Sequence, residues 1–186
     1  MLTNCLIAWG ANIPGPYGNP SETHKAVLKE LELAEFIILK KSRLYASVAF
    51  PDPQMPQYLN GCLELKIDCK ASDLLSFLKL IETKMGRQQN ARWGSRTCDL
   101  DLLNFDNQVC PSWKTFNYWY KLPFEKQLIK KPNELLLPHP RIQDRAFVLK
   151  PLMEVAASWV HPVLNLTTKE MFNAIPCEER DKVISI

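Results

Sequence analysis

The sequence contains little glycine, with only 6 glycines in 186 residues, and it lacks the glycine-rich loops that commonly bind phosphate. Proteins average about 7% glycine, which is roughly twice this content. Neither G-x-x-x-x-G-K-[ST] nor G-x-G-x-x-G occurs in the chain. If the protein handles phosphates, charged side chains and a metal ion must therefore replace a cradle of backbone amides.

The six cysteines form no C-x-x-C pair, and their irregular spacing in so long a chain is unlike that of a disulfide-stapled mini-domain. We therefore expect reduced and mostly buried thiols. The N-terminal residues lack a basic region, and no apolar run approaches the about 20 residues that span a bilayer. Together these absences predict a cytoplasmic protein.

A strong excess of either charge is also absent, because 23 Lys plus Arg face 20 Asp plus Glu and give a net charge of +3. So mild a balance requires neither nucleic acid nor a membrane surface as a partner. With 46% hydrophobic residues, the chain can bury one full-sized core. These values predict a single domain, residues 1–186, and exclude disorder.

Apolar runs with a two-residue period predict the strands. They are expected at residues 2–9, 36–45, 58–67, 97–105 and 146–149. Residues 48–57 are expected to form a loop, because they contain too many prolines for a strand interior.

Capping signals and a helical period predict the helices. Asn19 and Glu22 form a capping box around Pro20, Ser72 precedes a helix that stops near Gly86, and Thr167 opens the last helix. A short helix is expected at residues 152–157. The resulting order of strands and helices predicts an α+β, ferredoxin-like fold, with an antiparallel sheet and helices on one face.

Asp99 and Asp101 are the most informative pair for chemistry. Residues two apart on a strand project from the same face, so their carboxylates converge. Like charges at this spacing repel unless a cation lies between them, and Mg²⁺ typically takes one or two carboxylates plus water and substrate phosphates. Two solvated carboxylates at a strand end are the alternative.

A basic loop, residues 84–96, precedes this strand and contains no acidic residue. Arg87, Arg92 and Arg96 can surround phosphates that the same metal holds, since arginine binds phosphate in a bidentate manner. The alternative is a solvated loop, which the adjacent carboxylates disfavour.

Several residues further along the chain can complete a binding site. His139 is held between two prolines and can donate to a phosphate oxygen, although a lone loop histidine is the simpler reading. Arg145 and Phe147 are two apart and in an extended chain point the same way. Phe147, Tyr58 and Asn60 can form a slot for a planar ring with one amide at its edge, or a core aromatic pair.

Three motifs in this order resemble the 6-hydroxymethyl-7,8-dihydropterin pyrophosphokinase family of folate biosynthesis. They are GRQQNARWGSRTCDLDLL at residues 86–103, Tyr45 with PQYLN at residues 56–60, and LPHPRIQDRAFVLKPL at residues 137–152. The resemblance implies a ferredoxin-like fold and transfer of the ATP β,γ-pyrophosphoryl group to the pterin hydroxymethyl oxygen, which yields AMP. It also implies two Mg²⁺ ions and ATP as co-substrate.

The resemblance further assigns site residues by position. Asp99 and Asp101 match the metal ligands, and they match catalytic positions together with Arg87 and Arg96. The ATP side comprises Leu75, Glu82, Arg92, Leu102, His139 and Arg145. The pterin side comprises Ser47, Val48, Phe50, Tyr58, Asn60, Trp93 and Phe147.

Residues 110–133 carry six aromatic residues among five lysines, without a clear period, where the family usually has a short connection. We interpret them as an insertion that packs on the body of a monomer, as an extended hairpin, or on a second subunit, and that is dispensable for chemistry. The competing interpretation is a lid over the nucleotide. A patch this aromatic requires some surface to cover it.

Other functions are open. Departures from the family pattern in the basic loop admit a catalytically weakened, pterin-binding paralogue. A ferredoxin-like sheet with aromatic residues and lysines could instead bind single-stranded RNA, but no K/R-G-F-x-F-V-like stretch occurs on a strand. A nucleotidyltransferase-like D-x-D enzyme is the third alternative.

Overall fold

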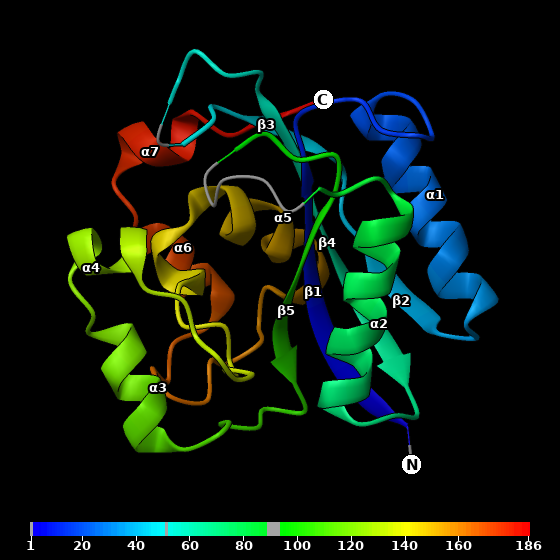
Figure 1. Ribbon diagram of the computed structural model, residues 1–186. Coiled ribbons are helices and arrows are strands. Elements are labelled where there is room, and N and C mark those ends of the chain that lie inside the picture. The colour runs from blue at the N-terminus through cyan, green and yellow to red at the C-terminus, as the bar shows by residue number, and fades with distance from the viewer. Residues whose placement is uncertain (1, 51, 89–93) are drawn as a thin grey trace.

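The computed structural model describes residues 2–50, 52–88 and 94–186, which form an antiparallel sheet with helices on both faces (Figure 1). The sheet order is β5-β1-β4-β3-β6, and β2 also pairs with β4. The strands are β1 (Thr3–Ala11), β2 (Ile37–Lys41), β3 (Tyr45–Ser47), β4 (Tyr58–Ile67), β5 (Asp99–Phe105) and β6 (Ile184–Ser185). The helices are α1 (Pro20–Leu33), α2 (Ala71–Lys84), α3 (Trp113–Tyr120), α4 (Phe124–Ile129), the 3₁₀ turn η1 (Ile142–Asp144), α5 (Ala146–Ala156), α6 (Thr168–Ala174) and α7 (Cys177–Asp181).

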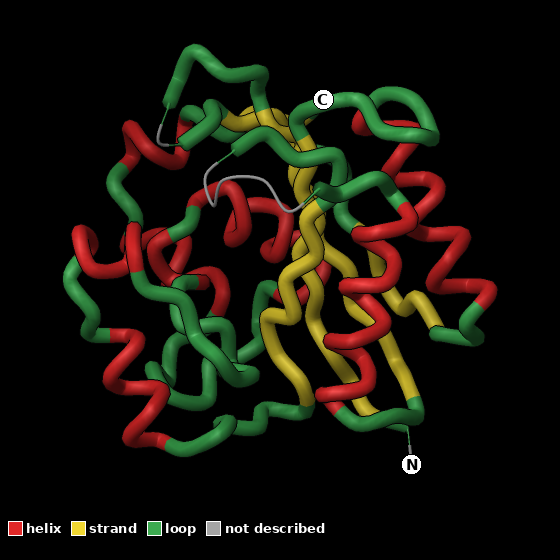
Figure 2. Tube along the Cα trace, viewed as in Figure 1, coloured by secondary structure: helices red, strands yellow, loops and turns green. Residues whose placement is uncertain are grey.

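Strand β1 is buried on both faces, which explains its nearly continuous apolar sequence. Ile7 and Trp9 pack with α1 and α2, whereas Leu6 and Ala8 pack with α5. Figure 2 shows the strands between helices on either side. The expectation of helices on one face is therefore wrong, because α5, with α6 packed against it, covers the second face and gives it a core of its own. The ferredoxin-like α+β class is confirmed.

The capping signals located two helix starts correctly. Asn19 caps α1 in a box with Glu22, and Thr167 caps α6 in a box with Glu170. Ser72 is not the cap of α2, because that helix begins at Ala71 behind Lys70, whose side chain makes no capping bond. The C-terminal signal is correct, since Gly86 follows the helix with φ +81°, a conformation that glycine adopts without strain.

The strand expected at residues 146–149 is helical, and it is continuous with the short helix expected at 152–157 as α5. A short apolar run does not distinguish a buried strand from a buried helix. Val148, Leu152 and Val155 are buried at helical spacing and settle the assignment. The strand expected at residues 36–45 is likewise divided into β2 and β3, which pair with different parts of β4.

Regular structure extends beyond the helix expected to be last. Helix α7 follows α6, and β6 then pairs with β3 at the edge of the sheet. All six cysteines are free; Cys5, Cys62 and Cys98 are buried, and Cys177 is exposed. Within the described part of the chain, no helix has the length and hydrophobicity needed to cross a membrane.

The insertion contains the two helices α3 and α4, and not the extended hairpin that was considered for it. Ser112 caps α3 by accepting the Thr115 N–H at 3.2 Å. Phe116 is fully buried and its ring lies 5.9 Å from that of His161, whereas Trp113 and Tyr118 are about half exposed. The insertion therefore docks part of its aromatic surface on its own chain.

Candidate functional site

One row of directly paired residues crosses the sheet and connects a candidate metal ligand, Asp99, with the candidate pterin residue Asn60. Asp99 pairs with Gly10, Gly10 with Asn60, and Asn60 with Tyr45. Residues paired directly across strands project from the same face, here the face covered by α5. Gly10 carries no side chain, so the row is open between the Asp99 carboxylate and the Asn60 amide.

Two arginines from the basic loop hold Asp99. Arg87 donates from Nη1 to Oδ1 of Asp99 at 2.6 Å, and Arg96 donates from Nη1 to Oδ2 at 2.5 Å. The side chains are about one-quarter exposed, so these pairs lie at the mouth of the site rather than in the core. The two arginines offset the negative charge that would otherwise oppose a neighbouring carboxylate.

Asp101 lies further along the same face and meets a different set of partners. Arg145 donates from Nη1 to Oδ2 of Asp101 at 3.2 Å, and Nε2 of His139 is 4.0 Å from the same oxygen. Nδ1 of His139 accepts the Arg141 N–H at 3.2 Å, which leaves the proton of the neutral ring on Nε2. Burial, with Arg145 and Arg141 as further causes, lowers the pKa of His139 well below its usual value.

Glu82 holds two parts of the site in place through hydrogen bonds. Its Oε1 accepts the Leu100 N–H at 2.7 Å and also accepts from Arg87. Burial is the main cause that raises the pKa of Glu82 to about 7, and the Arg87 guanidinium opposes the shift. Glu82 thus joins α2, β5 and the basic loop by hydrogen bonds, and its assignment to the ATP side stays a prediction.

Asn12 connects the loops on the two sides of the site. The sequence analysis did not identify it as a site residue. Its Oδ1 accepts the Arg96 N–H at 2.7 Å, and its Nδ2 donates to the Pro56 carbonyl at 3.1 Å and to Oγ of Ser95 at 3.3 Å. It is 5% exposed. A polar residue at the buried end of a strand was the one available signal, because these partners are more than 40 residues away.

Some of the residues expected to bind the pterin are held in place by hydrogen bonds. Nδ2 of Asn60 donates to Oγ of Ser47 at 2.9 Å and to the Tyr45 carbonyl at 3.2 Å, so Oδ1 remains to accept from a ligand. Tyr58 donates its hydroxyl to the Gly94 carbonyl at 3.3 Å. Val48 and Phe50 lie in the loop above and are 42% and 51% exposed.

Arg145 and Phe147 do meet, although not through the extended geometry expected of them. Arg145 caps α5 with φ −119° and ψ 93°, and Phe147 lies in the first turn of that helix. The guanidinium carbon of Arg145 is 5.8 Å from the centre of the Phe147 ring. Trp93 and Arg92, two other expected site residues, lie outside the described residues.

A cavity of about 300 Å³ lies beside Asp101, which is two residues along β5 from Asp99 at the end of the row. Five expected residues line it, namely Leu75, Asp101, Leu102, His139 and Arg145. Leu100, Leu135 and Leu136 add apolar surface, so the cavity has one charged and one apolar part. Its lining also includes residues of the insertion, which the sequence reading had set apart from the chemistry.

The donor set fits Mg²⁺ better than it fits a transition metal. Asp99 and Asp101 offer carboxylate oxygens on one face of β5, and the described residues include no cluster of three or more His, Cys, Asp or Glu side chains. Mg²⁺ needs only one or two carboxylates when phosphates and water fill its other positions. These two residues therefore suit a metal that arrives with a phosphate ligand.

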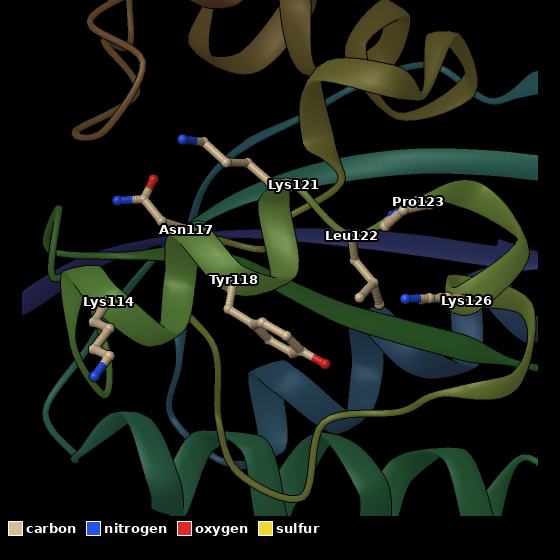
Figure 3. Close-up of a pocket in the computed structure, with 7 residues that line it drawn as sticks. All are labelled: Lys114, Asn117, Tyr118, Lys121, Leu122, Pro123 and Lys126. Atoms are coloured by element: carbon tan, nitrogen blue, oxygen red, sulfur yellow. The ribbon is translucent and has the colours of Figure 1, made fainter.

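A second cavity, of about 410 Å³, lies on the surface of α3 and α4 (Figure 3). Lys114, Lys121 and Lys126 line it with Tyr118, but the ammonium groups of Lys114 and Lys121 point away from each other. None of the expected site residues belongs to it. Expected site residues therefore line the first cavity and not this one.

The fold and the site together define a ferredoxin-like α+β protein whose carboxylates and arginines are arranged for an anionic, phosphate-bearing ligand. Comparison with known protein families is consistent with this class of protein. The chain belongs to the 7,8-dihydro-6-hydroxymethylpterin-pyrophosphokinase (HPPK) family, whose sequence model matches residues 6–157.

Individual relatives cover most of the chain. A Synechocystis protein named 2-amino-4-hydroxy-6-hydroxymethyldihydropteridine pyrophosphokinase is 33% identical over 173 residues, which are 92% of this chain and 76% of that protein. A Pseudomonas aeruginosa protein of the same name is 33% identical over 157 residues, 84% of this chain and 82% of that one. The crystal structure of wild-type Plasmodium falciparum HPPK-DHPS, with 15% identity, has a TM-score of 0.65 over 93% of this chain and 44% of that longer chain, and supports the fold.

Proposed function

We propose that this chain transfers the pyrophosphoryl group of ATP to the hydroxymethyl oxygen of 6-hydroxymethyl-7,8-dihydropterin, giving AMP and the pterin pyrophosphate in folate biosynthesis. Family membership supports the reaction. The row from Asp99 through Gly10 to Asn60 is the observation that carries it, because one open strip joins an anion-binding end to a buried amide.

ATP would enter the cavity lined by Leu75, Leu102 and His139, with its phosphates toward Asp101. Asp99 and Asp101 would hold two Mg²⁺ ions, which supply positive charge against the triphosphate when bound. Nε2–H of His139 can donate to a phosphate oxygen, since the lowered pKa keeps the ring neutral and Nδ1 is occupied.

The pterin would lie over Gly10, between the rings of Tyr58 and Phe147. Oδ1 of Asn60 can accept a ring N–H at the edge of the pterin, because Nδ2 is fixed by Ser47 and Tyr45. A ring that lacks the matching N–H would leave the buried Asn60 amide without a hydrogen-bond partner. Such a ring would bind more weakly, so Asn60 contributes specificity. Val48, Phe50 and Trp93 would belong to the loops that close over the ring.

Transfer requires Arg87 and Arg96 to exchange partners. Both now neutralise Asp99. When metal and triphosphate bind, the two guanidiniums can leave the carboxylate for the phosphoryl group, where arginine stabilises the charge that develops. Asp101 is the candidate acceptor for the hydroxyl proton.

We also propose that the protein works as a cytoplasmic monomer. Free cysteines support the compartment. Phe116 and Leu122 of the insertion are buried within their own chain, which supports the monomer over a dimer through this segment.

Nucleotide products measured with and without hydroxymethyldihydropterin test the proposed function. We expect AMP to form in the presence of Mg²⁺ only when the pterin is added, one AMP per pterin pyrophosphate. Pterin binding without AMP would identify a catalytically weakened paralogue. Pyrophosphate release with another acceptor would identify a nucleotidyltransferase, and binding of single-stranded RNA alone would refute the enzyme.

A further inference from the structure

The helices α3 and α4 belong to the wall of the nucleotide cavity. Trp119, Gln127 and Lys130 line it, and Pro132 continues the wall toward His139. The cavity runs along β5, an edge strand of the sheet. An edge strand has backbone N–H and C=O groups without a neighbouring strand, and proteins often cover such an edge with a helix or loop. Here residues 110–133, which lie outside the three family motifs, lie beside this edge.

The base of this segment is attached to the site itself. Cys110 donates its N–H to the Leu137 carbonyl at 2.9 Å, and Leu137 returns a bond to Cys110 at 3.1 Å. Two residues further along, the His139 N–H donates to the Leu103 carbonyl of β5 at 2.8 Å. Both ends of the segment therefore meet where the chain enters the His139 loop.

The side of the segment is anchored by Phe116. This residue is fully buried, and its ring lies 6.0 Å from Tyr120 and 5.9 Å from His161, which is also fully buried. In Figure 1, α3 and α4 lie on the opposite side of β5 from α1 and α2, which places α2 and the segment on two sides of the cavity. With its base and side fixed, α3 presents Trp119 to the cavity from a defined position.

The three lining side chains suit a nucleotide. The Trp119 ring offers an apolar face to a base, in a cavity whose other apolar lining is aliphatic. Gln127 donates from Nε2 to the Leu122 carbonyl, which leaves Oε1 to accept from a base or ribose. Lys130 also lines the cavity, and its positive charge can attract an anion there; its Nζ now donates to the Tyr118 hydroxyl at 2.9 Å.

The geometry points to a nucleotide-binding role for α3 and α4: Trp119 packs against the nucleoside of ATP, and Lys130 attracts the triphosphate. This inference rests on the proposed function and deepens it, since it assigns ATP affinity to a segment outside the three motifs. It replaces the expectation that residues 110–133 are dispensable for chemistry.

Matched substitutions separate this role from a merely structural one. Trp119→Ala and Lys130→Ala are compared with Trp113→Ala, also on α3, and with Lys131→Ala, the neighbouring lysine; neither control residue lines the cavity. The Kd of a non-hydrolysable ATP analogue with Mg²⁺ is measured by calorimetry, together with the KM for pterin and the melting temperature. Trp119→Phe serves as the conservative variant.

We expect Trp119→Ala and Lys130→Ala each to raise the nucleotide Kd about tenfold, as loss of a base stack or a phosphate contact does. The KM for pterin should stay within twofold of the parent value, and Trp119→Phe should recover most of the affinity. Both controls should bind like the parent. An unchanged nucleotide Kd in both cavity variants, with normal parent binding, would overturn the inference alone. A parent protein that binds no nucleotide would refute the proposed function and the inference with it.

Discussion

Arg96 donates to Asp99, three residues further along the chain, at 2.5 Å, so a candidate phosphate ligand and a candidate metal ligand are partners in the same structure. Arg87 binds the other oxygen of this carboxylate. If Asp99 holds the metal as proposed, metal and phosphate should bind together, because the metal would take the carboxylate and the phosphates would take the arginines. This exchange would couple ATP binding to Mg²⁺, and it provides the first prediction.

Asp99→Asn and Asp101→Asn should each abolish turnover and the Mg²⁺-dependent part of ATP binding, because a neutral amide is a poor ligand for Mg²⁺. Calorimetry with Mg²⁺ and with a chelator measures the effect. The free energy of unfolding without metal should fall by ~1 kcal/mol or less, since partly exposed ion pairs contribute little.

Asp106→Asn is the matched control for these two variants. Asp106 follows β5 with φ +50°, a conformation that asparagine tolerates, and it is exposed. Its variant should retain parental turnover. Substantial activity in either site variant would contradict the role of the carboxylates as metal ligands.

Arg96→Ala should lower kcat by about 10²–10³ with little change in the KM for pterin, if the guanidinium acts on charge that develops during transfer. Arg96→Lys should recover little of this loss, because an ammonium cannot reproduce the planar fork. Steady-state kinetics with both substrates varied measures the effect. Lys84→Ala, which removes an ion pair between α2 and α1 on the other face, is the cationic control. A change confined to KM would assign Arg96 to ground-state binding.

Gly10→Ala should weaken pterin binding without unfolding the protein. The added methyl group would lie 3.5 Å from Oδ1 of Asn60 and 3.8 Å from Cδ1 of Tyr58, ordinary contact distances that fill the open strip. A methyl group in a ligand's place costs about 1–3 kcal/mol, so the Kd for pterin should rise about fivefold or more.

Gly61→Ala is the control on the other face of the sheet, where the new methyl group would meet Leu44. It should leave the affinity for pterin unchanged, whatever it does to stability. Fluorescence titration with pterin compares the two variants. Equal pterin affinity in Gly10→Ala and the parent would show that the ring does not lie over β1.

Stability should decrease in acid because of His161. Burial lowers its pKa to about 4 in the folded protein, from an ordinary value of 6.5. A histidine with a lowered folded pKa contributes stability that is present above the unfolded pKa and is lost as the pH falls toward the folded one. Between pH 7 and pH 5 this residue alone should remove roughly 2 kcal/mol from the free energy of unfolding.

His161→Asn tests that cause. The amide oxygen can accept the Val163 and Leu164 N–H groups now bound by Nδ1, and it does not titrate in this range. Urea unfolding at both pH values should show a smaller loss in the variant than in the parent. Equal losses would assign the acid sensitivity to other groups, of which His24, with its pKa also lowered to about 4, is the next candidate.

Local pattern was sufficient to locate β4 at residues 58–67 and the face shared by Asp99 and Asp101, because strand alternation depends on neighbouring residues alone. It was insufficient for α5, where four apolar residues fit a strand and a helix equally. It could not find Asn12 or the role of Gly10, since both depend on strand register and on partners far along the chain.

The helices of the insertion could not be predicted from the sequence for another reason. Its two helices are short, and Phe116 is the one buried residue of α3, so their apolar positions show no clear period. The position of Trp119 at the cavity depends on the bridge between Cys110 and Leu137, which no local pattern announces. The folded chain shows that one of these aromatic residues, Trp119, lines the cavity, in agreement with the competing interpretation that the segment lies near the nucleotide.

The most direct test of the central claim follows the phosphates of ATP. The protein is incubated with Mg²⁺, 6-hydroxymethyl-7,8-dihydropterin and ATP labelled at the γ-phosphate, and the products are separated. The proposed reaction predicts that the label appears in a pterin carrying two phosphates, together with an equal amount of unlabelled AMP. Label in inorganic phosphate or in a pterin monophosphate, with ADP as the nucleotide product, would contradict pyrophosphoryl transfer.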